Sequence, residues 1–320
     1  MPFINEILKY KSLSIVGLEK NTGKTECLNY VLKRLPIERK KVCITSIGID
    51  GEGLDQVTNT KKPEITLRKG LYFATSETHY RTRKILSEIV DISDERTSLG
   101  RIITAKAITE GKSLLSGPSS APSLIRWLGE TNRFGIDLSI IDGALSRLSS
   151  ASPAISEALI LSTGAAFSAN IDTLVEKTAF VAEMVHLPII ELPKDETKMV
   201  TLSSLVKTTG SLIGDNIEVI RISGALTDGF LKKIMSEKRF GEVEIVVNDF
   251  TRIFASPQTY RAFASRGGKL KVEHSSKLIA ITVNPTSPSG MVLNSDKLCA
   301  VLSDKIGLPV YDIVKNNYEA

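Results

Sequence analysis

The first half of the chain alternates short apolar runs with stretches of helical spacing. Residues 12–16 form an apolar run that predicts a buried strand, and residues 26–35 place apolar side chains along one side of a helix. Further apolar runs at residues 42–47, 136–142 and 158–161 predict more buried strands. Strands that alternate with helices in this way predict an α/β fold with a doubly wound, mostly parallel sheet. Ligands of such sheets bind at the carboxyl ends of the strands.

The pattern changes twice along the chain. Residues 56–110 contain several short segments of strand character, which predict a β-rich insertion between the second and third core strands. A charged segment at residues 194–198 precedes a second alternation of strands and helices. We therefore expect a first domain at residues 1–195 and a second, smaller α/β domain at residues 196–320.

A polar turn at residues 17–25, GLEKNTGKT, joins the first predicted strand to the first predicted helix. Strand, Gly-Lys-Thr turn and helix are the context of a phosphate-binding P-loop, or Walker A motif. Gly23 can adopt backbone angles that aim N–H groups at phosphate oxygens, and the helix N-terminus adds its unpaired amides and dipole. The Lys24 ammonium can then reach the β- and γ-phosphates, and the Thr25 hydroxyl can bind Mg²⁺. The candidate nucleotide-binding residues are Gly17, Asn21, Thr22, Gly23, Lys24 and Thr25.

The spacing of this turn departs by one residue from the common pattern. Five residues separate Gly17 from Gly23, where most P-loops have four. A loop of the form G-x5-G-K-T resembles that of dethiobiotin synthetase and its relatives. The alternative interpretation is an ordinary glycine turn before a helix, with Lys24 and Thr25 exposed to solvent.

Acidic residues follow two of the predicted strands and are candidate Mg²⁺ ligands. The apolar strand at residues 136–142 ends in Asp142, followed by glycine, which is the form of a Walker B segment. The strand at residues 42–47 leads into the acidic turn IDGEGLD, in which Asp50 and Asp55 are the better candidates. Because Asp and Gly also form surface turns, a structural role for this turn stays open. A plain aspartate at a strand end is the alternative for Asp142.

Composition narrows the classes of function. The chain has 320 residues, of which 42% are hydrophobic and 24% charged, as is ordinary for a globular protein. No apolar run approaches a membrane span and charges interrupt the N-terminus, so we expect no membrane partner and a cytoplasmic location. The net charge is +5 and the basic clusters are short, so no nucleic-acid partner is expected. The three cysteines are too scattered for a disulfide framework or a zinc site, and the three histidines are too scattered for a metal cluster or a histidine-based triad. The sequence therefore identifies no catalytic residue.

The choice of nucleotide follows from a missing motif. The sequence has no Asn/Thr-Lys-x-Asp segment, which reads guanine in GTP-binding proteins, and this favours ATP. We therefore expect ATP and Mg²⁺ as cofactors. Residues 284–290, NPTSPSG, follow another predicted strand. Asn-Pro and Ser-Pro favour a structural turn there, and a role in reading a base or binding a partner is the alternative.

Several stretches together resemble one family: GLEKNTGKTECLN, TSIGIDGEGLDQVTNTKKPEI, IIDGALSRLSSA, LSTGAAFSANIDTLVEKT and VNPTSPSG. They are similar to the small P-loop subunit of the factor that reactivates lysine 5,6-aminomutase, an adenosylcobalamin- and pyridoxal-phosphate-dependent enzyme of lysine fermentation. The resemblance implies an ATP-dependent reactivase that works with a MutS-like ATPase subunit on an inactivated lysine aminomutase. It carries over to Gly23, Lys24, Thr25 and Asp142. It leaves open which subunit turns over ATP, and homo-oligomer formation is open too.

Two other functions remain as alternatives. A dethiobiotin-synthetase-like ligase that phosphorylates a carboxylate or carbamate shares the loop and the predicted fold. It needs a cationic pocket for its small acid, for which Lys20 and Arg147 are the candidates. The third function is a non-catalytic, nucleotide-sensing scaffold. If the protein is a reactivase subunit, we expect its second half, with the loop at residues 284–290, to face the partner.

Overall fold

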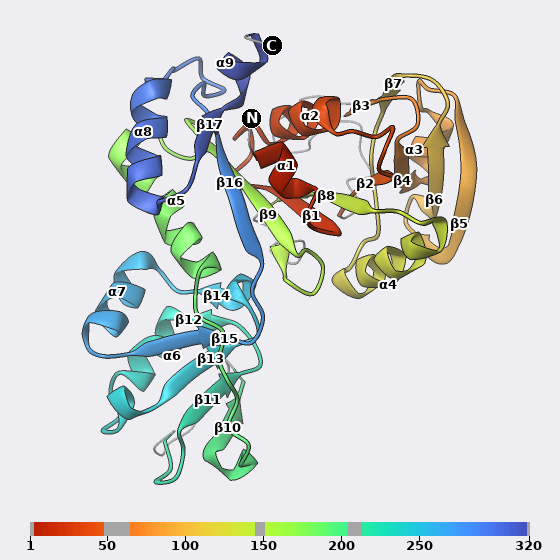
Figure 1. Ribbon diagram of the computed structural model, residues 1–320. Coiled ribbons are helices and arrows are strands. Elements are labelled where there is room, and N and C mark those ends of the chain that lie inside the picture. The colour runs from red at the N-terminus through yellow and green to blue at the C-terminus, as the bar shows by residue number, and fades with distance from the viewer. Residues whose placement is uncertain (1–2, 48–64, 145–150, 204–212, 319–320) are drawn as a thin grey trace. The chain divides into compact units, whose positions relative to one another are not determined.

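The computed structural model describes residues 3–47, 65–144, 151–203 and 213–318 (Figure 1). In these parts the chain is a mixed α/β protein. Its contacts divide it into two compact units. Unit 1 comprises Met1–Thr178 and Leu278–Ala320, and unit 2 comprises Ala179–Lys277.

The boundary between the units differs from the one expected at residues 195 and 196. The chain leaves unit 1 within helix α5 (Ile171–Val185) and returns at strand β16 (Lys277–Asn284). The C-terminal segment belongs to unit 1 because β16 lies next to β9 (Ala158–Gly164) in the large sheet. A hydrophobic pattern predicts that a strand exists, but it carries no information on which strands lie beside it.

A nine-stranded sheet forms the centre of unit 1, in the order β17-β16-β9-β1-β8-β2-β4-β6-β5. Strand β1 (Ser12–Gly17) pairs in parallel with β8 (Leu138–Ala144) and with β9. On the other side of β8, β2 (Val42–Ser46) is parallel to β8 and to β4 (Tyr72–Ser76). The sheet is mostly parallel, as predicted, and the carboxyl ends of these strands lie at one edge. All six residues of β1 are buried, which explains its continuous apolar run.

The described part of the predicted β-rich insertion is β-rich, but its strands extend the large sheet. Strand β4 is a core strand, and β6 (Gly100–Ala107) and β5 (Ser87–Thr97) continue the sheet as an antiparallel hairpin. Only the short strands β3 (Ile65–Leu67) and β7 (Gly111–Ser113) form a separate antiparallel pair. At the opposite end of the large sheet, β16 is parallel to β17 (Val310–Asp312).

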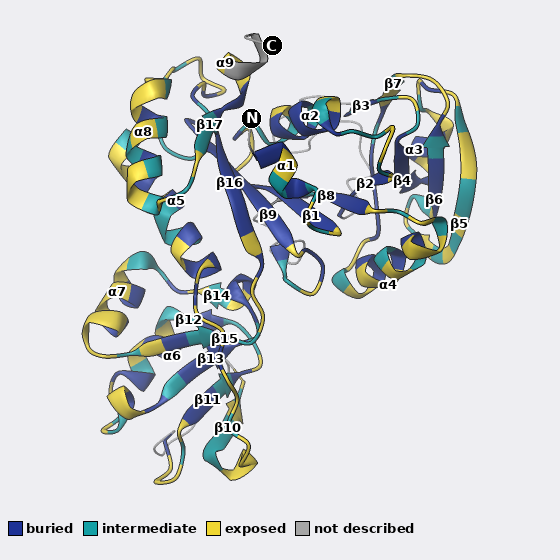
Figure 2. Cartoon of the chain, in the orientation of Figure 1, coloured by how far each residue is buried: buried dark blue, intermediate teal, exposed yellow. Residues whose placement is uncertain are grey.

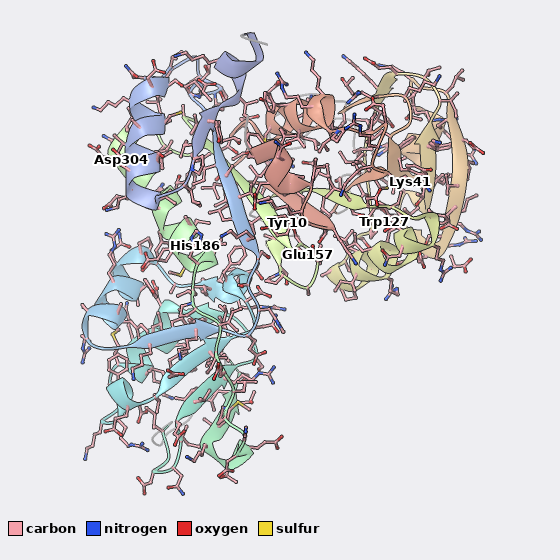
Figure 3. The ribbon with its side chains drawn as sticks, viewed as in Figure 1. Tyr10, Lys41, Trp127, Glu157, His186 and Asp304 are labelled. Atoms are coloured by element: carbon pink, nitrogen blue, oxygen red, sulfur yellow. The ribbon has the colours of Figure 1, made fainter. Side chains whose placement is uncertain are left out.

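Helices bury both faces of the sheet (Figure 2). Helix α2 (Lys24–Arg34) belongs to a core cluster that includes Ile140 of β8, and α4 (Ala121–Thr131) belongs to another that includes Ile141. Successive strand residues point to opposite faces, so the two helices cover opposite sides. Trp127 of α4 is buried and donates from Nε1 to Thr104 Oγ1 of β6 at 3.1 Å, so it packs the helix against the sheet (Figure 3). The remaining α-helices of unit 1 are α1 (Phe3–Ile7), α3 (Glu77–Arg81), α8 (Ser295–Ile306) and α9 (Ile313–Tyr318).

Unit 2 is built on a four-stranded parallel sheet in the order β10-β11-β13-β15. Two helices bury aromatic and aliphatic side chains within it, among them Phe230 and Phe263. Its elements are β10 (Met199–Leu202), β11 (Val219–Ile222), β12 (Leu226–Thr227), α6 (Asp228–Ile234), β13 (Glu244–Val247), β14 (Ile253–Phe254), α7 (Pro257–Ser265) and β15 (Lys269–Val272).

Candidate functional site

The loop at residues 17–25 joins β1 to α2, as the sequence predicts (Figure 1). Strand β1 ends at Gly17, α2 begins at Lys24, and Gly23 is the residue before the first helical turn. Gly23 has a φ angle of 86°, in the left-handed region that strains any residue with a side chain. A Cβ atom there would also lie 2.9 Å from the Cβ of Asn284. Because glycine has no side chain to cap the helix, the first N–H groups of α2 receive no side-chain hydrogen bond from it. Their partial positive charge therefore faces the loop.

The two threonines of the loop have different surroundings. Thr22 is buried, and its Oγ1 donates to the carbonyl of Glu19 at 2.8 Å. The turn is tight, since a Cβ atom on Gly17 would come within 2.9 Å of that same Thr22 oxygen. Thr25 is the second residue of α2 and is partly exposed. Thr22 therefore shapes the loop, whereas the Thr25 hydroxyl is at the helix N-terminus and accessible to a ligand.

The ends of two neighbouring strands hold the loop in position. The N–H of Leu18 donates to the carbonyl of Ser162 in β9 at 2.9 Å. Asn284, the last residue of β16, donates from Nδ2 to the carbonyl of Asn21 at 3.1 Å. Asn21 itself has a φ angle of 62°, so the backbone is left-handed on this side of the loop as well. The sequence placed Asn284 at the start of a turn and did not predict its contact with the loop at residues 17–25.

The loop at residues 284–290 was expected in a second domain, and its position in unit 1 corrects that expectation. Its first residue, Asn284, accepts the N–H of Thr286 on Oδ1 at 3.1 Å and thereby fixes its own side chain. The signal available in the sequence was that residues 284–290 follow a buried strand directly. Strands of a parallel sheet bring their carboxyl ends to one edge, where the loop at residues 17–25 also lies.

Lys24 and Asp142, which the sequence places far apart, form an ion pair. Ile15 of β1 lies beside Asp142 of β8 in the parallel register, so the carboxylate is at the level of the strand end that leads into the loop. Lys24 Nζ is 2.9 Å from Asp142 Oδ1, and the two side chains are 25% and 12% exposed. Asp142 Oδ1 is fully buried, and the ammonium lies beside it without the alignment of a hydrogen bond.

This pair fits a site for phosphate and a divalent cation. A metal cation could replace the partly exposed Lys24 ammonium beside the buried Asp142 oxygen. Asp142 and the hydroxyl of Thr25 offer the oxygen ligands that Mg²⁺ prefers, directly or through water. In the described residues no group of three or more His, Cys, Asp or Glu side chains gathers to hold a metal. Phosphate oxygens and water would complete the coordination of a Mg²⁺ ion held by Asp142 and Thr25.

Three other candidates lie outside the residues that the structure describes, namely Asp50, Asp55 and Arg147. The described chain stops just after β2 at Ile47, whose N–H donates to the carbonyl of Asp142 at 3.2 Å. Lys20, the other candidate for a small-acid pocket, is exposed in the loop.

A buried polar cluster at the end of β4 was also not predicted. Ser116 Oγ lies 2.8 Å from His79 Nδ1 and donates to Ser76 Oγ at 2.7 Å. The N–H of Ser116 donates to Thr75 Oγ1 at 3.1 Å. All four side chains are buried, at 6% exposure or less. The cluster therefore holds the segment before α4 against the sheet, and its serine–histidine contact is closed to a substrate.

Two of the three cysteines are core residues. Cys27 and Cys43 are fully buried, and burial raises the pKa of Cys27 to about 12 and the pKa of Cys43 as well. Both thiols stay protonated near neutral pH, which is the unreactive form. The partly buried Cys299 also has a raised pKa, because of burial first and of the charge of Asp312 second.

Comparison of the chain with models of protein families, with curated proteins and with solved structures found no match. Within the described parts, no helix combines the length and the apolar character needed to cross a membrane.

Proposed function

We propose that this protein binds ATP with Mg²⁺, using the loop at residues 17–25 as a P-loop and Asp142 as its Walker B carboxylate. The observation that carries the proposal is the 2.9 Å contact between Lys24 Nζ and Asp142 Oδ1. Each residue is a candidate on independent grounds, one from a Gly-Lys-Thr turn and the other from an apolar strand that ends in aspartate. A chance glycine turn gives no reason for its lysine to lie at this aspartate.

The geometry suggests how the free site changes when it fills. In the free protein, Asp142 neutralises the Lys24 ammonium at the N-terminus of α2. Bound phosphates would occupy that N-terminus, where the helix dipole and amides favour anions. Lys24 would turn to the β- and γ-phosphates, and Mg²⁺ would take its place beside Asp142 and Thr25. Asn284 and the strand end at Ser162 would keep the loop in shape during this exchange.

The test is a calorimetric titration of ATP with Mg²⁺ into wild type and Lys24→Ala. Charge-assisted hydrogen bonds contribute about 1.5–3 kcal/mol each, so the variant should bind roughly 10- to 150-fold more weakly. Lys33→Ala is a matched control, because Lys33 is an exposed residue in the last turn of the same helix. Equal affinities for wild type and Lys24→Ala would contradict the proposal.

We further propose, from the family resemblance of the sequence, that nucleotide binding serves an ATP-dependent reactivase. The partners would be a MutS-like ATPase subunit and a lysine 5,6-aminomutase whose adenosylcobalamin has been damaged. ATP can drive such a change only through its different affinity for two states of the complex.

The reactivase proposal has its own test. Inactivated aminomutase is mixed with fresh adenosylcobalamin, ATP, Mg²⁺, the MutS-like subunit and this protein. Activity should return with wild type and with Lys33→Ala, and should not return with Lys24→Ala. Recovery that is the same when this protein is left out would refute the role. Because ATP affinity is measured separately, the reactivase role can fail while the nucleotide site stands.

A further inference from the structure

A cavity lies at the β5 edge of the large sheet, between α3 and the hairpin of β5 and β6. Its volume is about 490 Å³, within the range of roughly 300–1,000 Å³ typical of sites for small molecules. Charged and apolar side chains line it: Glu77, Tyr80, Arg81, Ile89, Ile92, Arg96, Arg101 and Ile103. None of these residues belongs to the proposed nucleotide site.

The cavity gathers positive charge from three elements. Arg81 comes from α3, Arg96 from β5 and Arg101 from β6, and Glu77 is the one acidic residue in the lining. Glu77 Oε1 pairs with Arg81 Nη2 at 2.6 Å, and this contact is the main reason that the pKa of Glu77 is lowered. Arg101 adds a second, smaller lowering effect. The lining of the cavity therefore holds three guanidinium groups and one carboxylate.

Two of the arginines face each other across the hairpin. Arg96 and Arg101 are directly opposite in the antiparallel register of β5 and β6. Like charges in directly opposite positions destabilise a sheet. Both side chains also line the cavity, so their charges converge on one space. An arrangement that costs stability in the free protein is expected where a ligand of opposite charge is bound.

Two irregularities in β5 place Ile89, Ile92 and Arg96 on one face of the hairpin. The register shifts between Ile89 and Asp91 and again between Ile92 and Arg96. A regular strand has a side-chain period of two, so without the shifts Asp91 and Glu95 would share the face of Ile89. With the shifts, Ile92 lies opposite Ile103 and Arg96 opposite Arg101. The bulges thus replace an acidic surface with an apolar and basic one, which is a known use of bulges at binding sites.

The base of the cavity is apolar and open to solvent. Ile89 is 47% exposed and Ile92 is 46% exposed, although both lie in a strand of the large sheet. Ile103 is buried below them, and Tyr80 forms part of the wall. Apolar side chains beside convergent charges can contact both parts of an amphiphilic small molecule.

We propose that this cavity binds a small organic anion that carries a carboxylate or phosphate group on an apolar body. Arg96 and Arg101 would hold the anionic group, since guanidinium groups pair with both anions in a bidentate way. Ile89, Ile92 and Ile103 would contact the apolar body. Arg81 would join the two other arginines when it exchanges Glu77 for the ligand.

The cavity is distinct from the nucleotide site. Strand β6 is four strands away from β1, and strands lie about 4.8 Å apart, so the distance along the sheet is roughly 19 Å. Phosphoryl transfer needs reacting atoms about 3–3.5 Å apart. The cavity therefore cannot serve as the acceptor pocket of a ligase at the P-loop. The inference does not rest on the proposed function, and either can fail alone.

The experiment follows the isoleucine methyl groups of the full chain by NMR. Phenyl phosphate and phthalate are the probes, with inorganic phosphate and neutral benzyl alcohol as comparisons. We expect both probes to shift the methyl signals of Ile89, Ile92 and Ile103 to saturation, with Ile125, an exposed residue of α4 outside the cavity, unmoved. Tighter binding of phenyl phosphate identifies a phosphate ligand, and tighter binding of phthalate identifies a carboxylate.

Variants then separate the cavity from general attraction between charges. Arg96→Gln and Arg101→Gln should each weaken probe binding about tenfold or more, and neither should lower the unfolding temperature, because each relieves the repulsion between like charges. Glu77→Gln should tighten binding, since it frees Arg81. Arg133→Gln is the matched control, an exposed arginine outside the cavity with the same change of charge.

Three results would overturn the proposal. The first is that neither phenyl phosphate nor phthalate gives a saturable shift at the three cavity isoleucines. The second is an equal loss of affinity in Arg133→Gln and Arg101→Gln, which would indicate unspecific attraction. The third is inorganic phosphate or benzyl alcohol binding as tightly as phenyl phosphate, which would show that the cavity does not combine an anionic and an apolar contact.

Discussion

Replacing Asp142 by asparagine should change nucleotide binding in opposite directions with and without Mg²⁺. The free site holds Lys24 Nζ at 2.9 Å from Asp142 Oδ1, and ATP needs that lysine for its phosphates. Without metal, wild type must break this pair before the lysine can bind phosphate. Asp142→Asn has no such pair to break, so metal-free ATP should bind it more tightly. With Mg²⁺, the variant lacks the charged ligand and should gain little from the metal.

The size of the effect follows from the distance and the exposure of the pair. At 2.9 Å and an effective dielectric constant of about 20, two unit charges attract by roughly 6 kcal/mol. Hydration of the separated groups offsets most of this. Breaking one side of a buried pair costs about 3–5 kcal/mol and an exposed pair contributes about 0–1 kcal/mol. With side chains 25% and 12% exposed, we expect about 1–2 kcal/mol, or a 5- to 30-fold tighter metal-free complex.

The assay is a titration of ATP in the presence of EDTA and again in the presence of Mg²⁺. The ratio of the two dissociation constants should be large for wild type and should approach one for Asp142→Asn. Asp137→Asn is the matched control, because Asp137 precedes the same strand at its other end and accepts the N–H of Lys41 at 2.8 Å. A parallel loss of affinity in both titrations would refute the reasoning and would make Asp142 a structural residue.

Three further outcomes are expected. Gly23→Ala should lower the unfolding temperature and abolish ATP binding. A φ of 86° costs about 1–2 kcal/mol for alanine, and the new Cβ would collide with Asn284. Unchanged ATP binding would contradict this prediction. Cys27, with its pKa raised to about 12 by burial, should resist thiol reagents in the native protein at pH 8 and react on unfolding, and rapid native labelling would show that the core opens. The pKa of Asp228 is lowered below its ordinary 3.8, chiefly by the N–H of Ser256. The Asp228 carboxylate therefore stabilises unit 2 fully above pH 3.8, and this stabilisation is lost as the pH falls through the lowered pKa. In Asp228→Asn, the free energy of unfolding, followed by circular dichroism, should depend less on pH in this acid range.

Features set by local pattern could be predicted from the sequence. The strand before the loop, the helix after it and the strand that ends in Asp142 all have continuous or helical apolar spacing. Their order predicts a parallel sheet, and a parallel sheet brings Lys24 and Asp142 to one edge. The contact between these two side chains is a consequence of topology, which explains why it could be anticipated without knowledge of the distance.

Features set by long-range pairing could not be predicted. Asn284 supports the loop only because β16 lies next to β9, and nothing in the composition of either strand encodes that choice. The same holds for Arg96, which shares a face with Ile89 only because of the register shifts in β5. A regular alternation read from the sequence would have assigned Arg96 to the opposite face.

The central claim is tested most directly by a crystal structure with a non-hydrolysable ATP analogue and Mg²⁺. The account predicts phosphate density at the N-terminus of α2, with Lys24 Nζ moved from Asp142 to the phosphates. The metal should lie beside the Thr25 hydroxyl and the Asp142 carboxylate. A complex in which the nucleotide binds elsewhere, or in which Lys24 remains paired with Asp142 while phosphates occupy the loop, would contradict it.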